Sequence, residues 1–170
     1  MLVTGASSGI GRELCRELAA RRASRLILVA RREAELRSLA DELGRLGVST
    51  DMRPTDLGDP AAVAALAGSL ASEPVDALCL AAGFGDYGLF DRAEWPRIST
   101  MVQVNLLSVL HLVHAVLPGM VTRGHGDIMV LTSGSAGTGP HGVRRCGGSR
   151  RRAGGTPARI HGDRRGTVRP

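Results

Sequence analysis

Thr4-Gly5-Ala6-Ser7-Ser8-Gly9-Ile10-Gly11, the stretch at residues 4–11, joins a short apolar run to a segment with the apolar spacing of an amphipathic helix. Glycine has no Cβ, so three glycines allow a tight turn and a close approach of the backbone to a ligand. The N–H groups that open a helix also favour an anion. The spacing G-x-x-x-G-x-G is wider than the general dinucleotide fingerprint G-x-G-x-x-G. The stretch predicts a turn that holds a pyrophosphate, with a plain strand-to-helix turn that binds no nucleotide as the alternative.

Strand-like and helix-like segments alternate around and after this turn. The expected strands are 1–4, 26–30, 48–55, 75–82 and 127–132. The expected helices are 9–22, 33–46, a third that starts at residue 60 and a long one at 98–121. Asp59 is the expected N-cap of the third helix, and Gly47 the expected left-handed residue after the second. This alternation predicts an α/β fold, a doubly wound parallel sheet of the Rossmann type with about five strands.

The apolar spacing within the helices predicts which side chains are buried. In the first helix, Ile10, Leu14 and Leu18 recur at i, i+4 and i+8 and indicate one buried stripe. The corresponding residues of the second helix are Leu36, Leu39, Leu43 and Leu46. The long segment 98–121, for which Ser99 is the expected cap, is apolar around much of its circumference, so we expect it to be buried on more than one side.

Charge and composition divide the chain near residue 142. All 22 basic residues besides histidine are arginines, and nine of them lie in 144–170, where Asp163 is the only acid. That stretch also has six glycines and few large apolar residues, so it buries too little surface to order itself. We therefore expect a nucleotide-binding domain at 1–142 and a disordered Arg/Gly-rich basic tail at 143–170.

The composition favours a cytoplasmic protein without disulfides or metal. No apolar run reaches the length of about 18 residues that a membrane span requires, and no signal peptide is expected. Cys15, Cys79 and Cys146 are odd in number and form no C-x-x-C pair, so we expect reduced thiols. His111 and His114 share a helix face but have no third ligand at a suitable spacing, so no metal site is expected.

Several of these motifs, in this order, resemble the short-chain dehydrogenase/reductase family over residue 1 to about 142. The stretch 4–11 matches the family motif T-G-x-x-x-G-x-G, and Asn105 matches the asparagine of its long helix. Asp56-Leu57 match the pair that contacts adenine. The resemblance implies an oxidoreductase that transfers hydride between a nicotinamide cofactor and a small carbonyl or alcohol substrate. It also implies dimer contacts through the helix at 98–121, and therefore a homo-oligomer.

The same resemblance extends to the loop after the fourth strand. Ala82-Gly83 match the end of the family motif N-N-A-G, whereas Leu80 and Ala81 replace its two asparagines, so these positions cannot supply the family's backbone-bracing hydrogen bond. The cofactor-binding residues that the resemblance implies are Thr4, Gly5, Ser7, Ser8, Gly9, Ile10, Gly11, Asp56, Leu57, Ala82 and Gly83.

Two arginines at the end of the second strand indicate which nicotinamide cofactor is bound. An acidic residue about 20 positions after the glycine turn would accept the ribose hydroxyls of NAD. Arg31 and Arg32 stand there instead, and guanidinium groups suit a 2′-phosphate through bidentate, charge-assisted hydrogen bonds. The sequence therefore favours NADP over NAD. The alternative is that both arginines are solvated and neutralised by Glu33 and Glu35.

The catalytic residues of the family are matched only in part. Ser133 holds the position of the catalytic serine, with Ser135 as the alternative, and Asn105 keeps a supporting role. In the window of the family motif Y-x-x-x-K, Cys146 replaces the tyrosine and Arg150 replaces the lysine. A thiol is acidic enough to replace a phenol but has a shorter side chain, and a guanidinium cannot give up a proton as an amine can.

The family continues with a further helix pair and two strands that have no counterpart here, so we expect a sheet that is incomplete toward the C-terminus. The change in composition inside the Y-x-x-x-K window is typical of an out-of-frame reading of a GC-rich gene. The nucleotide sequence tests this hypothesis, which requires a Y-x-x-x-K in another frame past Pro140.

Three functions follow from these observations. The first is an NADP-dependent oxidoreductase of the short-chain type, and the second is an NADP-binding remnant without turnover. The third is non-specific association of the basic tail with nucleic acid through phosphate contacts. Because the tail contains no aromatic residue on which bases could stack, we expect no more than electrostatic attachment to nucleic acid.

Overall fold

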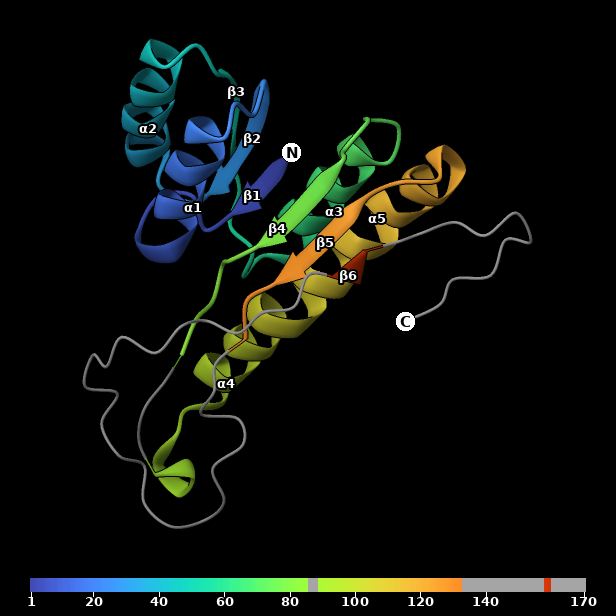
Figure 1. The fold of residues 1–170 in the computed structure, drawn as a ribbon. Coiled ribbons are helices and arrows are strands. Elements are labelled where there is room, and N and C mark those ends of the chain that lie inside the picture. The colour runs from blue at the N-terminus through green and yellow to red at the C-terminus, as the bar shows by residue number, and fades with distance from the viewer. Residues whose placement is uncertain (86–88, 133–157, 160–170) are drawn as a thin grey trace.

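The computed structural model describes residues 1–85, 89–132 and 158–159, which form one sheet with helices on both faces (Figure 1). The strands are β1 (Leu2–Thr4), β2 (Arg25–Ala30), β3 (Ser49–Pro54), β4 (Ala77–Leu80), β5 (Asp127–Val130) and β6 (Ala158–Arg159). The helices are α1 (Gly9–Ala20), α2 (Glu33–Arg45), α3 (Pro60–Leu70), η1 (Phe90–Arg92), α4 (Trp95–Val102), η2 (Gln103–Leu107) and α5 (Ser108–Arg123).

The strand order β3-β2-β1-β4-β5-β6 confirms the predicted Rossmann-type fold. The first five strands in this order are parallel, and the two-residue β6 pairs with β5 in the antiparallel direction. Strand β1 lies between β2 and β4, so the order of the strands reverses there. In open α/β sheets, ligands bind beyond the carboxyl ends of the strands at such a point.

Alternating strand residues face two separate cores. Leu2, Ile27 and Leu78 point to the face covered by α3 and α5, whereas Val3 and Leu28 point to the face covered by α1 and α2 (Figure 1). Strand side chains alternate with period two, and crossover helices cover both faces of a parallel sheet. The core therefore follows directly from the apolar runs that predicted the strands.

The expected caps of α2 and α3 are confirmed. The Asp59 side chain accepts the N–H of Ala61 at 2.8 Å, and Pro60 opens α3, where its missing N–H would have no helical partner. Gly47 lies two residues beyond α2 with a φ of 80°, in the left-handed region that favours glycine.

The predicted buried stripe of the first helix is only partly right, because Leu14 and Leu18 pack against the core, partly buried, whereas Ile10 does not. The buried residues of α1 are Gly11, Cys15 and Ala19, whereas Ile10 is 64% exposed and Leu14 is only half-buried. A Cβ at Gly11 would lie 2.4 Å from the backbone oxygen of Gly5, so this face of the helix approaches the turn too closely for a larger side chain. Small residues, not the leucine spacing, decide which side of α1 faces the sheet.

Two further expectations about helix ends are also wrong. Leu46 is 63% exposed because α2 ends at Arg45 and Leu46 already belongs to the cap. Ser99 does not cap the long helix, which begins at Trp95 after the extended residue Glu94.

The long helix comprises α4, η2 and α5 and buries one side only. Ser108, Leu112, Val116 and Met120 are buried against the core, and most of the opposite face is exposed. The expected burial on more than one side is therefore wrong for the described chain. The 29 residues Trp95–Arg123 are long and apolar enough to cross a membrane by length and composition. Within this stretch, one side of α5 packs on α3 and on the sheet.

Candidate functional site

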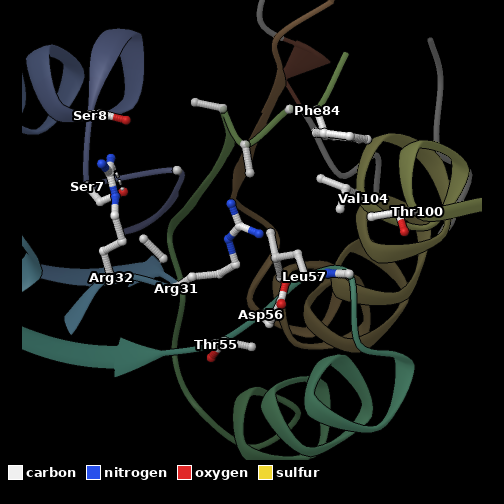
Figure 2. Close-up of a pocket in the computed structure, with 16 residues that line it drawn as sticks. Ser7, Ser8, Arg31, Arg32, Thr55, Asp56, Leu57, Phe84, Thr100 and Val104 are labelled. Atoms are coloured by element: carbon white, nitrogen blue, oxygen red, sulfur yellow. Dashed lines mark hydrogen bonds between the residues drawn. The ribbon is translucent and has the colours of Figure 1, made fainter. Parts of the chain in front are cut away.

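A cavity of about 650 Å³ opens at the carboxyl ends of β1 to β4 (Figure 2). Nine of the residues predicted to bind the cofactor line it: Gly5, Ser7, Ser8, Arg31, Arg32, Asp56, Leu57, Ala82 and Gly83. Phe84, in the glycine-rich segment 83–88 that was expected from the sequence to border the cofactor, also lines the cavity. The lining residues that were not predicted are Ala30, Thr55, Gly58, Ala81, Thr100 and Val104. Four predicted residues, namely Thr4, Gly9, Ile10 and Gly11, belong to the turn but do not line the cavity.

The turn at 4–11 depends on glycine at two positions. Gly5 has a φ of 71°, and a Cβ there would lie 2.9 Å from the backbone N and Cα of Ala82. A Cβ at Gly11 would collide with the backbone of Gly5. The backbone of the turn therefore lies against both the loop after β4 and its own helix. Ser8 provides no side-chain cap, so the first N–H groups of α1 remain available to an anion.

A buried threonine braces the floor of the cavity. The hydroxyl oxygen of Thr4 accepts the N–H groups of Ala81 and Ala82, each at 3.1 Å, and Thr4 is 1% exposed. These hydrogen bonds join the end of β1 to the end of β4. The backbone after β4 is thus held by Thr4, although Leu80 and Ala81 replace the two asparagines of the family motif.

Arg31 and Arg32 point in different directions. Arg31 extends into the middle of the cavity toward Leu57 and Asp56, whereas Arg32 turns to the glycine turn and donates from Nη2 to Ser7 Oγ at 3.2 Å (Figure 2). Within residues 1–85 and 89–132, neither arginine pairs with a carboxylate.

The acids next to these arginines have other partners. Glu33 pairs with Arg37 at 2.7 Å, and Glu35 pairs with Arg12 at 3.2 Å. The geometry therefore does not favour the alternative in which Glu33 and Glu35 neutralise the arginines. Two guanidinium groups that line the cavity, with no carboxylate partner in the part of the chain that the structure describes, suit a phosphate dianion.

Residues of the long helix complete the far wall. The Asn105 side chain accepts the N–H of Phe84 at 2.8 Å and donates to its carbonyl at 2.7 Å. Gln103 Nε2 donates to the carbonyl of Leu57 at 3.4 Å. Gln103 was missed, although a polar residue within an otherwise apolar helical segment was a usable signal. One turn of this helix therefore contacts the loops after both β3 and β4.

The other predicted catalytic positions lie outside the described residues. These are Ser133, its alternative Ser135, Cys146 and Arg150. The described cysteines are not nucleophiles of the site, because burial raises the pKa of Cys15 to about 12 and also raises the pKa of Cys79. Among the residues that the structure describes, no group of three or more His, Cys, Asp or Glu side chains could hold a metal ion.

Comparison with known proteins identifies the family. Residues 1–145 match the short chain dehydrogenase family, and the chain therefore belongs to the short-chain dehydrogenases/reductases. An uncharacterized oxidoreductase of Bacillus subtilis, YmfI, is 31% identical over 133 residues, which cover 78% of this chain and 54% of that protein. The chain thus spans about half the length of this relative.

Solved structures show the same architecture with cofactor bound. A short-chain dehydrogenase from Sphingobium yanoikuyae in complex with NADPH has a TM-score of 0.72 and 34% identity, covering 75% of this chain and 50% of that one. A metagenomic short-chain oxidoreductase in complex with NADP has a TM-score of 0.69 and 33% identity, covering 75% of this chain and 58% of that one.

Proposed function

We propose that this chain binds NADP(H) in the cavity at the carboxyl ends of β1 to β4. The observation that carries the proposal is a pair of arginines with no carboxylate partner among the described residues, beside a turn with no Cβ at Gly5 or Gly11. Two solved relatives that contain NADPH or NADP support it. The turn would hold the pyrophosphate through its N–H groups, and Arg31 with Arg32 would hold the 2′-phosphate.

The proposed reaction of the whole protein is hydride transfer between nicotinamide and a small carbonyl or alcohol. When bound, the cofactor would donate a hydride in its reduced form, NADPH, or accept one in its oxidised form, NADP⁺. In this chain, Asp56 and Leu57 would contact the adenine, and Asn105 would fix the loop at Gly83 and Phe84 next to the reacting end. Binding without turnover is the alternative function, because Cys146 and Arg150 stand at the positions of the family's tyrosine and lysine.

NADPH should bind more tightly than NADH, by about tenfold to a hundredfold, because each charge-assisted hydrogen bond to the 2′-phosphate contributes about 1.5–3 kcal/mol. Fluorescence titration with both cofactors measures the preference. The variant Arg31→Asp with Arg32→Ala should lose it. Arg37→Ala is the control for loss of positive charge near the start of α2, since Arg37 does not line the cavity. Equal affinities of the parent for both cofactors would refute the role of the arginines.

We also propose that two copies associate through the outer face of the long helix. Val102, Leu106 and Leu110 recur at i, i+4 and i+8 on this face and are 42%, 51% and 56% exposed. Val121, 46% exposed, extends the apolar surface toward the end of α5. Contiguous apolar surface of this kind marks protein contacts more often than single exposed residues do.

Leu106→Asp with Leu110→Asp should convert a dimer into a monomer in sedimentation velocity, because two buried charges at an interface cost several kcal/mol. Leu46→Asp is the control, since Leu46 is also exposed but lies at the end of α2. A parent chain that sediments as a monomer at all accessible concentrations would contradict the proposed dimer.

A further inference from the structure

We propose that Ser108 is a positioning residue of the cofactor cavity, which acts by holding the wide helical turn that carries Asn105. The proposal rests on the NADP-binding function proposed above. Ser108 does not line the cavity, so its effect on cofactor binding would pass through Asn105.

The wide turn is a local departure from the α-helix. Residues Gln103–Leu107 form a π-helix, in which the N–H of Ser108 bonds to the carbonyl of Gln103. Such turns are rare, and they occur frequently at functional sites. Ser108 is 1% exposed, and its hydroxyl donates to the carbonyl of Val104 at 2.7 Å. The buried hydroxyl thus gives a partner to a carbonyl inside the turn.

The wide turn positions the side chain of Asn105, whose hydrogen bonds require an accurate placement. Asn105 makes two hydrogen bonds to the same residue, accepting the N–H of Phe84 at 2.8 Å and donating to its carbonyl at 2.7 Å. Hydrogen bonds weaken steeply when distance or angle departs from the optimum, so two at once define the position of the amide closely. Phe84 and Val104 both line the cavity (Figure 2).

Loss of the hydroxyl would act at the far wall of the cavity. Without it, the carbonyl of Val104 lacks this buried partner, and the turn gains stability by relaxing toward the regular α-helical spacing of 3.6 residues per turn. That change rotates Asn105 away from Phe84. Phe84 then loses both hydrogen bonds to Asn105, although Thr4 still holds Ala81 and Ala82. A cofactor that contacts Phe84 must then order this residue on binding.

Amide hydrogen exchange of Phe84 in the ligand-free chain tests the first step. The N–H of Phe84 should be protected in the parent, and its exchange should accelerate about fivefold or more in Ser108→Ala and in Asn105→Ala. Ser108→Thr keeps a hydroxyl and should restore protection. Thr122→Ala is the matched control, because the Thr122 hydroxyl also bonds a carbonyl four residues earlier, that of Pro118 at 2.9 Å, in the same helix. Unchanged exchange of Phe84 in Ser108→Ala overturns the proposal.

A double-mutant cycle for NADPH affinity tests whether Ser108 acts through Asn105. Each single variant should weaken binding about fivefold, because both release the same contact between Asn105 and Phe84, and the double variant should be no weaker than either. Effects that multiply to about 25-fold would show that Ser108 acts independently of Asn105 and would overturn the proposal. A parent that shows the exchange pattern but binds no NADPH would refute the proposed function alone.

Discussion

Gly11→Ala should remove NADPH binding and lower the free energy of unfolding by about 3 kcal/mol or more. A Cβ at this position would lie 2.4 Å from the oxygen and 2.7 Å from the carbonyl carbon of Gly5. Both contacts are to backbone, so no flexible side chain can move aside. Overpacking of this kind typically costs about 1–3 kcal/mol, and here the displaced group is the turn itself. Binding is lost because the N–H groups of the turn would no longer converge on the pyrophosphate.

Thermal or urea unfolding, followed by NADPH titration of the folded fraction, measures both effects. Gly68→Ala is the control, because Gly68 lies inside α3 and a Cβ there would meet no atom within 4 Å. That substitution should stabilise the chain by about 0.5–1 kcal/mol, the usual advantage of alanine over glycine in a helix. Parent-like stability and affinity in Gly11→Ala would show that the close approach of α1 to the turn is not required.

The order of strands and helices could be predicted because both depend on local information. Short apolar runs identified β1, β2 and β4, and the Asp59 cap and Gly47 are short-range signals that the structure confirms. The glycine turn could also be predicted from the sequence, because close approach of its backbone to a ligand requires residues without side chains. Thr4, by contrast, was placed in the cofactor site from the motif alone, and the structure shows it as a buried brace.

Orientation and irregular backbone could not be predicted in the same way. The leucine spacing of α1 pointed to Ile10, but the close approach at Gly11 rotates a face of small residues toward the sheet. This depends on a contact with Gly5 that only the folded turn creates. The π-turn that contains Asn105 could not be predicted from the sequence either. The apolar residues before and after it keep helical spacing, so the pattern does not show that the helix widens there.

The sequence predicted that two arginines would lie at the cofactor site, but it did not predict the directions of their side chains. Arg31 and Arg32 are consecutive, and extended backbone at Arg32 sends their side chains in different directions. Only one of them enters the middle of the cavity (Figure 2). The sequence predicted only that both guanidinium groups would suit a 2′-phosphate. The structure joins Arg32 to the glycine turn, so the two substitutions should not have equal effects on NADPH affinity.

We expect the replacement of the family's tyrosine and lysine by Cys146 and Arg150 to have a large effect on the rate of ketone reduction. A general acid must lie within about 2.6–3.2 Å of the substrate oxygen, and it contributes about 10² to 10⁴-fold to the rate. A thiol at Cys146 has a shorter reach than the phenol that the family places there. Arg150 supplies positive charge but cannot pass on a proton. We therefore expect the parent chain to reduce no ketone above the uncatalysed rate, even when NADPH is bound.

The test is NADPH oxidation with reactive ketones and diketones, measured for the parent and for Cys146→Tyr with Arg150→Lys. Cys146→Ser is the control, since it changes the same position without supplying a phenol. Turnover that appears only in the double variant would show that the proton relay alone is broken and that substrate positioning is intact. Absence of turnover in both would mean that positioning is lost as well, since proximity contributes more to the rate than one proton donor does. Robust turnover by the parent would contradict the expectation and would require a proton donor other than tyrosine.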